Sequence, residues 1–193
     1  VILDEIYQGL HHRPVAYSTG LAVSDNLFIL NSFSKYFGMT GWRLGWVVVP
    51  EEAIDPITKL AQNLFISPNA PAQYGALAAF DDQALATYEA RREIFAQRAA
   101  LMADGLKRLG FQIPVMPDGA FYHYVDASHT GMTSRDFCWR LMDEFQVAVT
   151  PGSDFGVHNA DRYARFAYTR ASDTIEEGLA RIARALEAWG INT

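Results

Sequence analysis

A lysine, two serines and an arginine lie close together in residues 31–45. Lys35 follows Ser32 and Ser34 directly, and Arg43 comes eight residues after Lys35. A lysine in an apolar or cationic setting has a lowered pKa and can attack a carbonyl group as a free amine. Serine hydroxyls and a guanidinium suit an anion such as phosphate. On composition alone, a solvated Lys35 and a surface Arg43 remain the alternative interpretation.

A second candidate group is an aspartate and a tyrosine near the start of the chain. Asp4 follows the apolar residues 1–3, which predict the tail of a buried strand. Its carboxylate would be largely desolvated there and would need a cationic partner, such as a protonated ring nitrogen. Tyr7 could place its phenol near the same ligand. A helix N-cap for Asp4 and a packed Tyr7 are the structural alternative.

Both groups follow predicted strands, which is where open α/β sheets keep their ligand sites. Residues 1–3 and 27–30 predict two strands, separated by enough chain for a parallel crossover. Residues 43–49 predict a third strand, which Pro50 ends.

The rest of the chain predicts helices alternating with short strands. Residues 73–109 predict one long helix, or two with a break near Asp81 and Asp82. The last helix is predicted to begin with Ser172 or Asp173 as its N-cap. We place a domain boundary near Ala90, which gives domains of residues 1–90 and 91–193. Beyond residue 110, strands are predicted at 121–125, 147–149 and 165–168, and helices at 134–145 and 174–189.

Together these segments resemble the fold-type I aminotransferases that use pyridoxal 5′-phosphate (PLP), specifically the aspartate aminotransferase-like class I/II family. Asp4 and Tyr7 match the family's D-x-x-Y segment, and residues 32–35 with Arg43 match its S-x-S-K segment and following arginine. The resemblance covers essentially the whole chain. It implies an α/β fold, the back part of the large PLP-binding sheet domain followed by a small α+β C-terminal domain. Further matching segments are residues 67–71, 119–122, 151–156 and 164–168.

The resemblance implies a PLP-dependent transfer of an amino group between an amino acid and a 2-oxo acid. Lys35 would form the internal aldimine and then shuttle a proton in a ping-pong reaction. Asp4 would keep the pyridinium nitrogen of PLP protonated, and Tyr7 would bond the ring phenolate oxygen.

The same resemblance implies how the two anionic groups are bound. Ser32 and Arg43 would hold the phosphate, with Ser34 as the alternative to Ser32, and Arg165 would clamp the α-carboxylate of the substrate as a bidentate fork. Without the family context, Arg165 would be a strand-edge charge. The resemblance also implies a homodimer. A C–S lyase of the same fold and the aminotransferase-like sensor domain of a transcription regulator remain alternatives.

Composition and charge argue against several other classes of function. The net charge is −6, from 16 Lys and Arg against 22 Asp and Glu. The sequence has no basic cluster, which argues against nucleic acid as the main partner. No apolar run approaches the roughly 20 residues of a membrane span. Cys138 cannot form an internal disulfide, so we expect a cytoplasmic protein. The chain opens without Met inside an apolar stretch, so we expect residues upstream and an inactive fragment.

Three weaker patterns favour structural explanations. Residues 32–35 also match S-x-x-K and residues 24–26 match S-D-N of penicillin-binding serine hydrolases, but their order is reversed and no K-T-G occurs. His11 and His12 are adjacent with no spaced carboxylate partner, so we expect a solvated loop and no metal. Cys138 lies between Phe137 and Trp139, which predicts a packed small hydrophobe.

Overall fold

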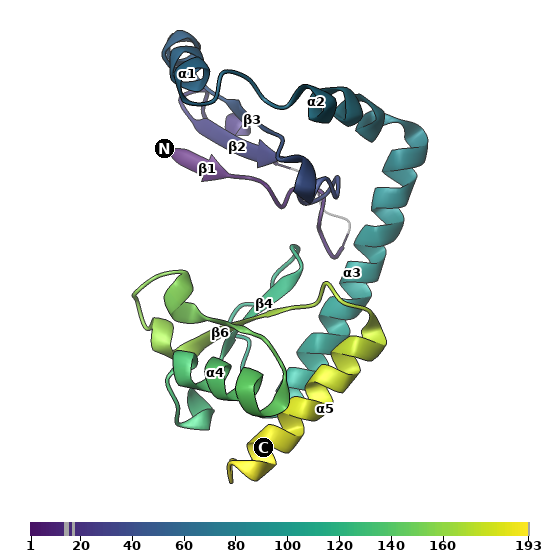
Figure 1. Cartoon of the computed structure of the whole chain (residues 1–193), viewed down its shortest axis with the longest axis vertical. Helices are drawn as coiled ribbons and strands as arrows, with labels where there is room; N and C mark the ends of the chain where they lie inside the picture. Colours follow the sequence, from purple (N-terminus) through teal and green to yellow (C-terminus); the bar gives the residue numbers. More distant parts are fainter. Residues whose placement is uncertain (14–15, 17, 193) are drawn as a thin grey trace. The chain divides into compact units, whose positions relative to one another are not determined.

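Two three-stranded sheets organise the chain in its computed structural model (Figure 1). The structure describes residues 1–13, 16 and 18–192. The chain divides into two compact units, Val1–Glu93 and Ile94–Thr193, and the boundary falls inside one long helix. Each unit has its own sheet and its own buried cluster.

The first unit contains a mixed sheet with strand order β1-β2-β3. β1 and β2 are parallel, with Asp4 opposite Leu30, whereas β2 and β3 are antiparallel. The expected parallel crossover is therefore confirmed. Its strands are β1 (Ile2–Asp4), β2 (Phe28–Ser32) and β3 (Gly45–Val48).

The strand boundaries differ from the predictions at the ends that carry the candidate residues. β1 includes Asp4 and β2 reaches Ser32, so both polar residues close a strand. β3 begins after Arg43, because Arg43 has a left-handed backbone with φ of 53°. The predicted burial of β1 is wrong here, since Ile2 is exposed. The reason is that β1 is an edge strand, which pairs with β2 alone among the described residues.

Helices connect the first sheet to the second unit. α1 (Glu51–Leu64) was not predicted, because it contains Pro56 and begins without a side-chain cap. α2 (Ala70–Leu77) begins at Asn69, whose side chain accepts a hydrogen bond from the Ala72 N–H. A short 3₁₀ turn separates α2 from α3 (Asp82–Arg108), which confirms the predicted break near Asp81 and Asp82.

The second unit is an antiparallel sheet with helices packed on one face. Its strand order is β4-β6-β5, and its long helices are the C-terminal part of α3 and two helices that follow. Alternation along β4 and β6 buries His123, Val125, Ala164 and Phe166. The elements are β4 (Tyr122–Asp126), α4 (Ser134–Phe145), β5 (Thr150–Pro151), β6 (Tyr163–Ala167) and α5 (Ser172–Ala188).

In the second unit both predicted helices are confirmed, and the strands predicted at 121–125 and 165–168 correspond to β4 and β6, whereas the predicted N-cap of the last helix and the strand at 147–149 are wrong. α4 has the predicted bounds, and its N-cap Thr133 accepts from the Asp136 N–H; α5 confirms the last helix. The N-cap of α5 is Ala171 rather than Ser172 or Asp173, because the Ala171 carbonyl already accepts the first helical bond, from Ile175. Residues 147–149 are not a strand, because Val147 N–H bonds to Leu141 O at the end of α4.

Across the described residues, no helix is long and apolar enough to cross a membrane.

Candidate functional site

The parallel pairing of β1 and β2 places the candidate residues Asp4 and Ser32 at the carboxyl ends of two neighbouring strands. Asp4 is the last residue of β1, and Ser32 is the last residue of β2. The Glu5 N–H donates to Leu30 O at 2.9 Å, which holds the chain leaving β1 beside β2. The carboxyl ends of the two strands therefore point the same way, as in other α/β ligand sites.

The loop after β2 is fixed by buried anchors and backbone hydrogen bonds. Phe33 and Met39 are buried, and the Met39 N–H donates to Phe33 O at 2.9 Å. Ser32 Oγ accepts from the Ser34 N–H at 3.0 Å and donates to Leu44 O at 3.3 Å. The loop thus has a defined path around Lys35.

Arg43 lies against this loop on the side of the serines. Its Nη1 donates to Thr40 O at 3.0 Å and to Ser34 Oγ at 3.5 Å. The left-handed backbone of Arg43 turns the chain at this point and directs the side chain back to the loop. Ser32, Ser34 and Arg43 therefore form one connected group with two hydroxyls and a guanidinium. Such a donor set fits a phosphate monoester.

Lys35 lies next to Tyr7, 28 positions away in the sequence. The Lys35 Nζ is 5.5 Å from the centre of the Tyr7 ring, and both side chains are half-buried. This contact joins the turn after β1 to the loop after β2. The donor set therefore includes an amine and a phenol beside the anion-binding group, which fits PLP.

Asp4 also lies at the carboxyl end of its strand, but its carboxylate is exposed. Its Oδ1 accepts a hydrogen bond from the Ile6 N–H at 3.2 Å. The expectation of a desolvated carboxylate is wrong for the described residues, because β1 is an edge strand. The carboxylate remains available to a cationic ligand.

Arg165 belongs to the second unit, on the sheet face opposite the core. It lies between Tyr124 of β4 and Thr150 of β5 in the strand register. Its guanidinium carbon is 5.3 Å from the centre of the Tyr122 ring and 4.6 Å from that of Phe155. Its Nε is buried and has no hydrogen-bond acceptor among the described residues. A buried donor in this state suits an anionic ligand.

Tyr122 and Phe155 lie in segments that match the family, but the sequence alone indicates no role for either residue. Tyr122 closes residues 119–122, and Phe155 lies in residues 151–156. The signal that could have identified Tyr122 is its alternation with Tyr124, which places both on the face of Arg165. No local pattern identifies Phe155, because a loop brings it to Arg165.

The first unit also has a polar network that includes Tyr36 of the lysine loop, the segment of residues 33–44 between β2 and β3. Tyr36 donates its hydroxyl to Glu89 at 2.7 Å, and Arg92 Nε donates to the same carboxylate at 2.7 Å. These two donors, the Tyr36 hydroxyl first, hold the pKa of Glu89 below its usual value. The network ties the lysine loop to α3 within the first unit.

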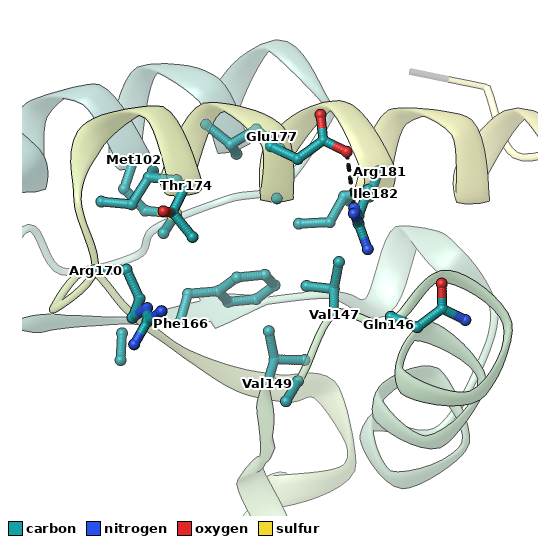
Figure 2. Close-up of a pocket in the computed structure, with 15 residues that line it drawn as sticks. Met102, Gln146, Val147, Val149, Phe166, Arg170, Thr174, Glu177, Arg181 and Ile182 are labelled. Atoms are coloured by element: carbon teal, nitrogen blue, oxygen red, sulfur yellow. Dashed lines mark hydrogen bonds and ion pairs between the residues drawn. The ribbon is translucent and has the colours of Figure 1, made fainter.

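A cavity of about 440 Å³ lies in the second unit between α5, β6 and the segment that follows α4 (Figure 2). Its apolar lining includes Val147, Val149 and Phe166, and Arg181 donates to Glu177 at 2.8 Å on its wall. None of the predicted site residues lines this cavity. It therefore contributes nothing to the chemistry expected of them.

Two of the weaker sequence patterns can be compared with the structure. Cys138 is buried in the core of the second unit, which confirms the packed interpretation, and burial raises the pKa of its thiol to about 12. Among the residues that the structure describes, no group of three or more His, Cys, Asp or Glu could hold a metal ion.

Comparisons with known proteins agree on one family. The family model for aminotransferase class I and II matches residues 1–182. Valine–pyruvate aminotransferase of Mycobacterium tuberculosis is 37% identical over 183 residues, which cover 94% of this chain and 47% of the relative. (5-Formylfuran-3-yl)methyl phosphate transaminase of Methanocaldococcus jannaschii is 37% identical over 185 residues, covering 94% of this chain and 48% of the relative.

A solved structure gives the same result at the level of the fold. The crystal structure of an aminotransferase from Mycobacterium tuberculosis superposes with a TM-score of 0.91 and 37% identity, covering 97% of this chain and 49% of that one. The chain spans about half the length of the relatives it matches. It has the α/β, fold-type I architecture of PLP-dependent enzymes, and it belongs to the aminotransferase class I and II family.

Proposed function

We propose that the protein carrying this chain is a PLP-dependent aminotransferase, which moves an amino group between an amino acid and a 2-oxo acid. The observation that carries the proposal is the position of Lys35, whose Nζ lies 5.5 Å from the Tyr7 ring centre and which directly follows Ser34, the serine that accepts a hydrogen bond from Arg43. Family membership supports the same cofactor and reaction.

In this proposal each residue of the first unit has a separate task. Bound PLP supplies an electron-withdrawing ring that stabilises negative charge on the substrate. The Lys35 amine holds the cofactor and moves a proton at the substrate Cα. Asp4 keeps the ring nitrogen protonated, and Tyr7 donates to the ring oxygen. The phosphate is held by Ser32, Ser34 and Arg43.

Arg165 of the second unit binds the α-carboxylate of donor and acceptor alike. A planar guanidinium can donate two parallel hydrogen bonds to a carboxylate. The buried Nε without an acceptor supports this task. We also propose that residues 1–90 belong to the PLP-binding domain and residues 91–193 to the small domain. The names of the relatives, one a valine–pyruvate aminotransferase, support an amino acid and a 2-oxo acid as substrates.

The test is an assay of the full-length protein, loaded with PLP, against a panel of amino acids and 2-oxo acids. We expect a new amino acid to form from the 2-oxo acid, and we expect Lys35→Ala to abolish it. Lys59→Ala is the matched control, because Lys59 is exposed and pairs with Asp55 on α1. Equal loss in both variants would contradict the task given to Lys35.

The same assay separates the two alternatives. A C–S lyase would release a thiol, ammonia and a 2-oxo acid from a sulfur amino acid without any acceptor. A sensor domain would bind PLP and an amino acid without turnover. Either result would replace the aminotransferase proposal.

We further propose a cytoplasmic homodimer. Several large apolar side chains of the first unit are exposed, as expected for a surface that another part of the assembly covers. They include Ile54, Leu60, Leu64, Phe65 and Ile66. Light scattering on the full-length protein would test the dimer, and a monomer at micromolar concentration would contradict it.

A further inference from the structure

The outer face of the second sheet carries aromatic side chains around one arginine. Because side chains alternate along a strand, His123 and Phe166 face the core, whereas Tyr122, Tyr124 and Arg165 face away from it. Tyr124 lies directly across from Arg165, and its ring stacks on that of Tyr163 at 4.9 Å. Burial raises the pKa of the Tyr124 hydroxyl, as expected for a partly desolvated face.

Two of the rings contact the guanidinium itself. The Tyr122 and Phe155 ring centres lie 5.3 Å and 4.6 Å from the Arg165 guanidinium carbon, within the range of cation–π attraction. Aromatic faces attract the cation but accept none of its in-plane hydrogen bonds. The Arg165 Nε therefore stays without an acceptor among the described residues, although it is buried.

Phe155 contacts Arg165 instead of joining the core. Phe155 is 50% exposed, and its ring is perpendicular to that of Tyr124, with the two ring centres 6.2 Å apart. The loop that carries it is tightly held at Gly152, where an added Cβ would lie 2.3 Å from Ala160 O. The Phe155 N–H donates to Gly152 O at 2.9 Å. The position of the ring is thus set by the loop and not by core packing.

We propose that Tyr122 and Phe155 are positioning residues. They hold the Arg165 guanidinium in one orientation and shield its two faces from water, so that it is ready to bind a carboxylate. This inference rests on the proposed function of Arg165. The two rings limit the rotamers of the arginine and exclude water from its faces, so less order is lost when the carboxylate binds. The rings accept none of the in-plane N–H bonds, so these donors are left for a carboxylate.

The test measures kinetics of the full-length, PLP-loaded enzyme with the ring removed or kept. For Phe155→Leu and Tyr122→Leu, we expect KM for the amino acid and for the 2-oxo acid to rise by about 5- to 10-fold, as for the loss of one cation–π contact. We expect kcat and PLP affinity to stay within about twofold, because chemistry and cofactor contacts are unchanged. The ring-keeping variants Phe155→Tyr and Tyr122→Phe should keep KM near that of the wild type.

Tyr163→Leu is the matched control. Tyr163 is an aromatic residue of the same face that stacks on Tyr124 and makes no cation–π contact with Arg165 among the described residues. An equal rise of KM in Tyr163→Leu would overturn the inference, and so would an unchanged KM in Phe155→Leu. If Tyr122→Leu fails to fold, the half-exposed Phe155 decides the question alone.

Arg165→Lys separates this inference from the proposed function. We expect its KM for amino acids to rise steeply with unchanged PLP affinity, because lysine lacks the planar fork. An unchanged KM in Arg165→Lys would show that Arg165 does not bind the carboxylate. It would overturn both the proposed function of Arg165 and the inference about Tyr122 and Phe155. A raised KM in Arg165→Lys, with no effect in the ring variants, would overturn the inference about Tyr122 and Phe155 alone.

Discussion

The amine of Lys35 lies 5.5 Å from the centre of the Tyr7 ring, although the two residues come from different loops. The contact follows from the parallel pairing of β1 and β2, which ends both strands at the same sheet edge. A cation close to an aromatic ring is attracted to its face. The lysine is therefore held near the residues that we propose for the ring and the phosphate of PLP.

Lys35 is predicted to carry the cofactor covalently. Borohydride reduction of the PLP-loaded full-length protein should fix the label to Lys35, because reduction traps a carbonyl group bound to an amine. Peptide mass mapping would locate the label. Lys59 and Lys107 serve as internal controls, since Lys59 belongs to α1 and Lys107 to α3, and neither lies in the S-x-S-K segment. A label on either of them instead of Lys35 would contradict the prediction.

Asp4→Asn is predicted to keep PLP binding but to slow turnover. The charge-assisted hydrogen bond that we propose to the ring nitrogen would be worth roughly 1.5–3 kcal/mol, so we expect turnover to fall by about 10- to 100-fold. Steady-state kinetics with saturating PLP would measure it. Asp25→Asn, an exposed acid in the same unit, is the control. Near-normal turnover in Asp4→Asn would refute the role of Asp4.

The order of the elements in the first unit could be predicted because short apolar runs and turn residues mark its strands. Ser32 and Lys35 follow such a run directly, so their position at a strand end could be inferred from the sequence. The exposure of Asp4 could not, because it depends on which strands flank β1. α1 was missed because Pro56 argues against a helix in any local pattern.

In the second unit, the periodic apolar face of α4 predicted its bounds. The failure at residues 147–149 has a tertiary cause, since Val147 closes α4 through Leu141 and the strand begins only at Thr150. The contact between Arg165 and Phe155 could not be predicted from the sequence either, because it depends on how a loop folds and not on the spacing of residues.

Gly152→Ala is predicted to disrupt the loop before β6. An added Cβ would lie 2.3 Å from Ala160 O and 2.6 Å from Tyr163 O, and both atoms are backbone. Backbone cannot move aside as a side chain can, so we expect a loss of about 2–4 kcal/mol in stability and faster amide exchange in β6. Hydrogen exchange of the full-length protein would measure this.

Gly156→Ala is the control in the same loop, because nothing lies within 4 Å of its added Cβ. We expect it to change stability by less than about 1 kcal/mol. Equal protection of β6 in both variants would show that the loop is not held at Gly152.

Asp126 is predicted to stabilise the second unit in a pH-dependent way. Its side chain is 9% exposed, and it accepts from Arg162 Nη2 at 2.7 Å and from the Ser128 N–H at 2.8 Å. Burial alone would raise the pKa of this carboxyl, but the hydrogen bonds from Ser128 and Arg162 outweigh it and lower the pKa below the usual value. The ionised form is therefore the one that the fold favours.

The sign of the effect follows from this lowered pKa. The stabilisation is complete above the unfolded-state pKa of about 3.9 and is lost as the pH falls through the lower, folded-state value. Asp126→Asn should therefore be less stable than the wild type by about 1–3 kcal/mol near neutral pH, and the difference should shrink below about pH 4. Denaturant unfolding of the full-length protein across this range would measure it, with the exposed Asp161→Asn as control. A difference between wild type and Asp126→Asn that stays constant down to about pH 2.5 would show that the carboxylate charge is not what stabilises this unit.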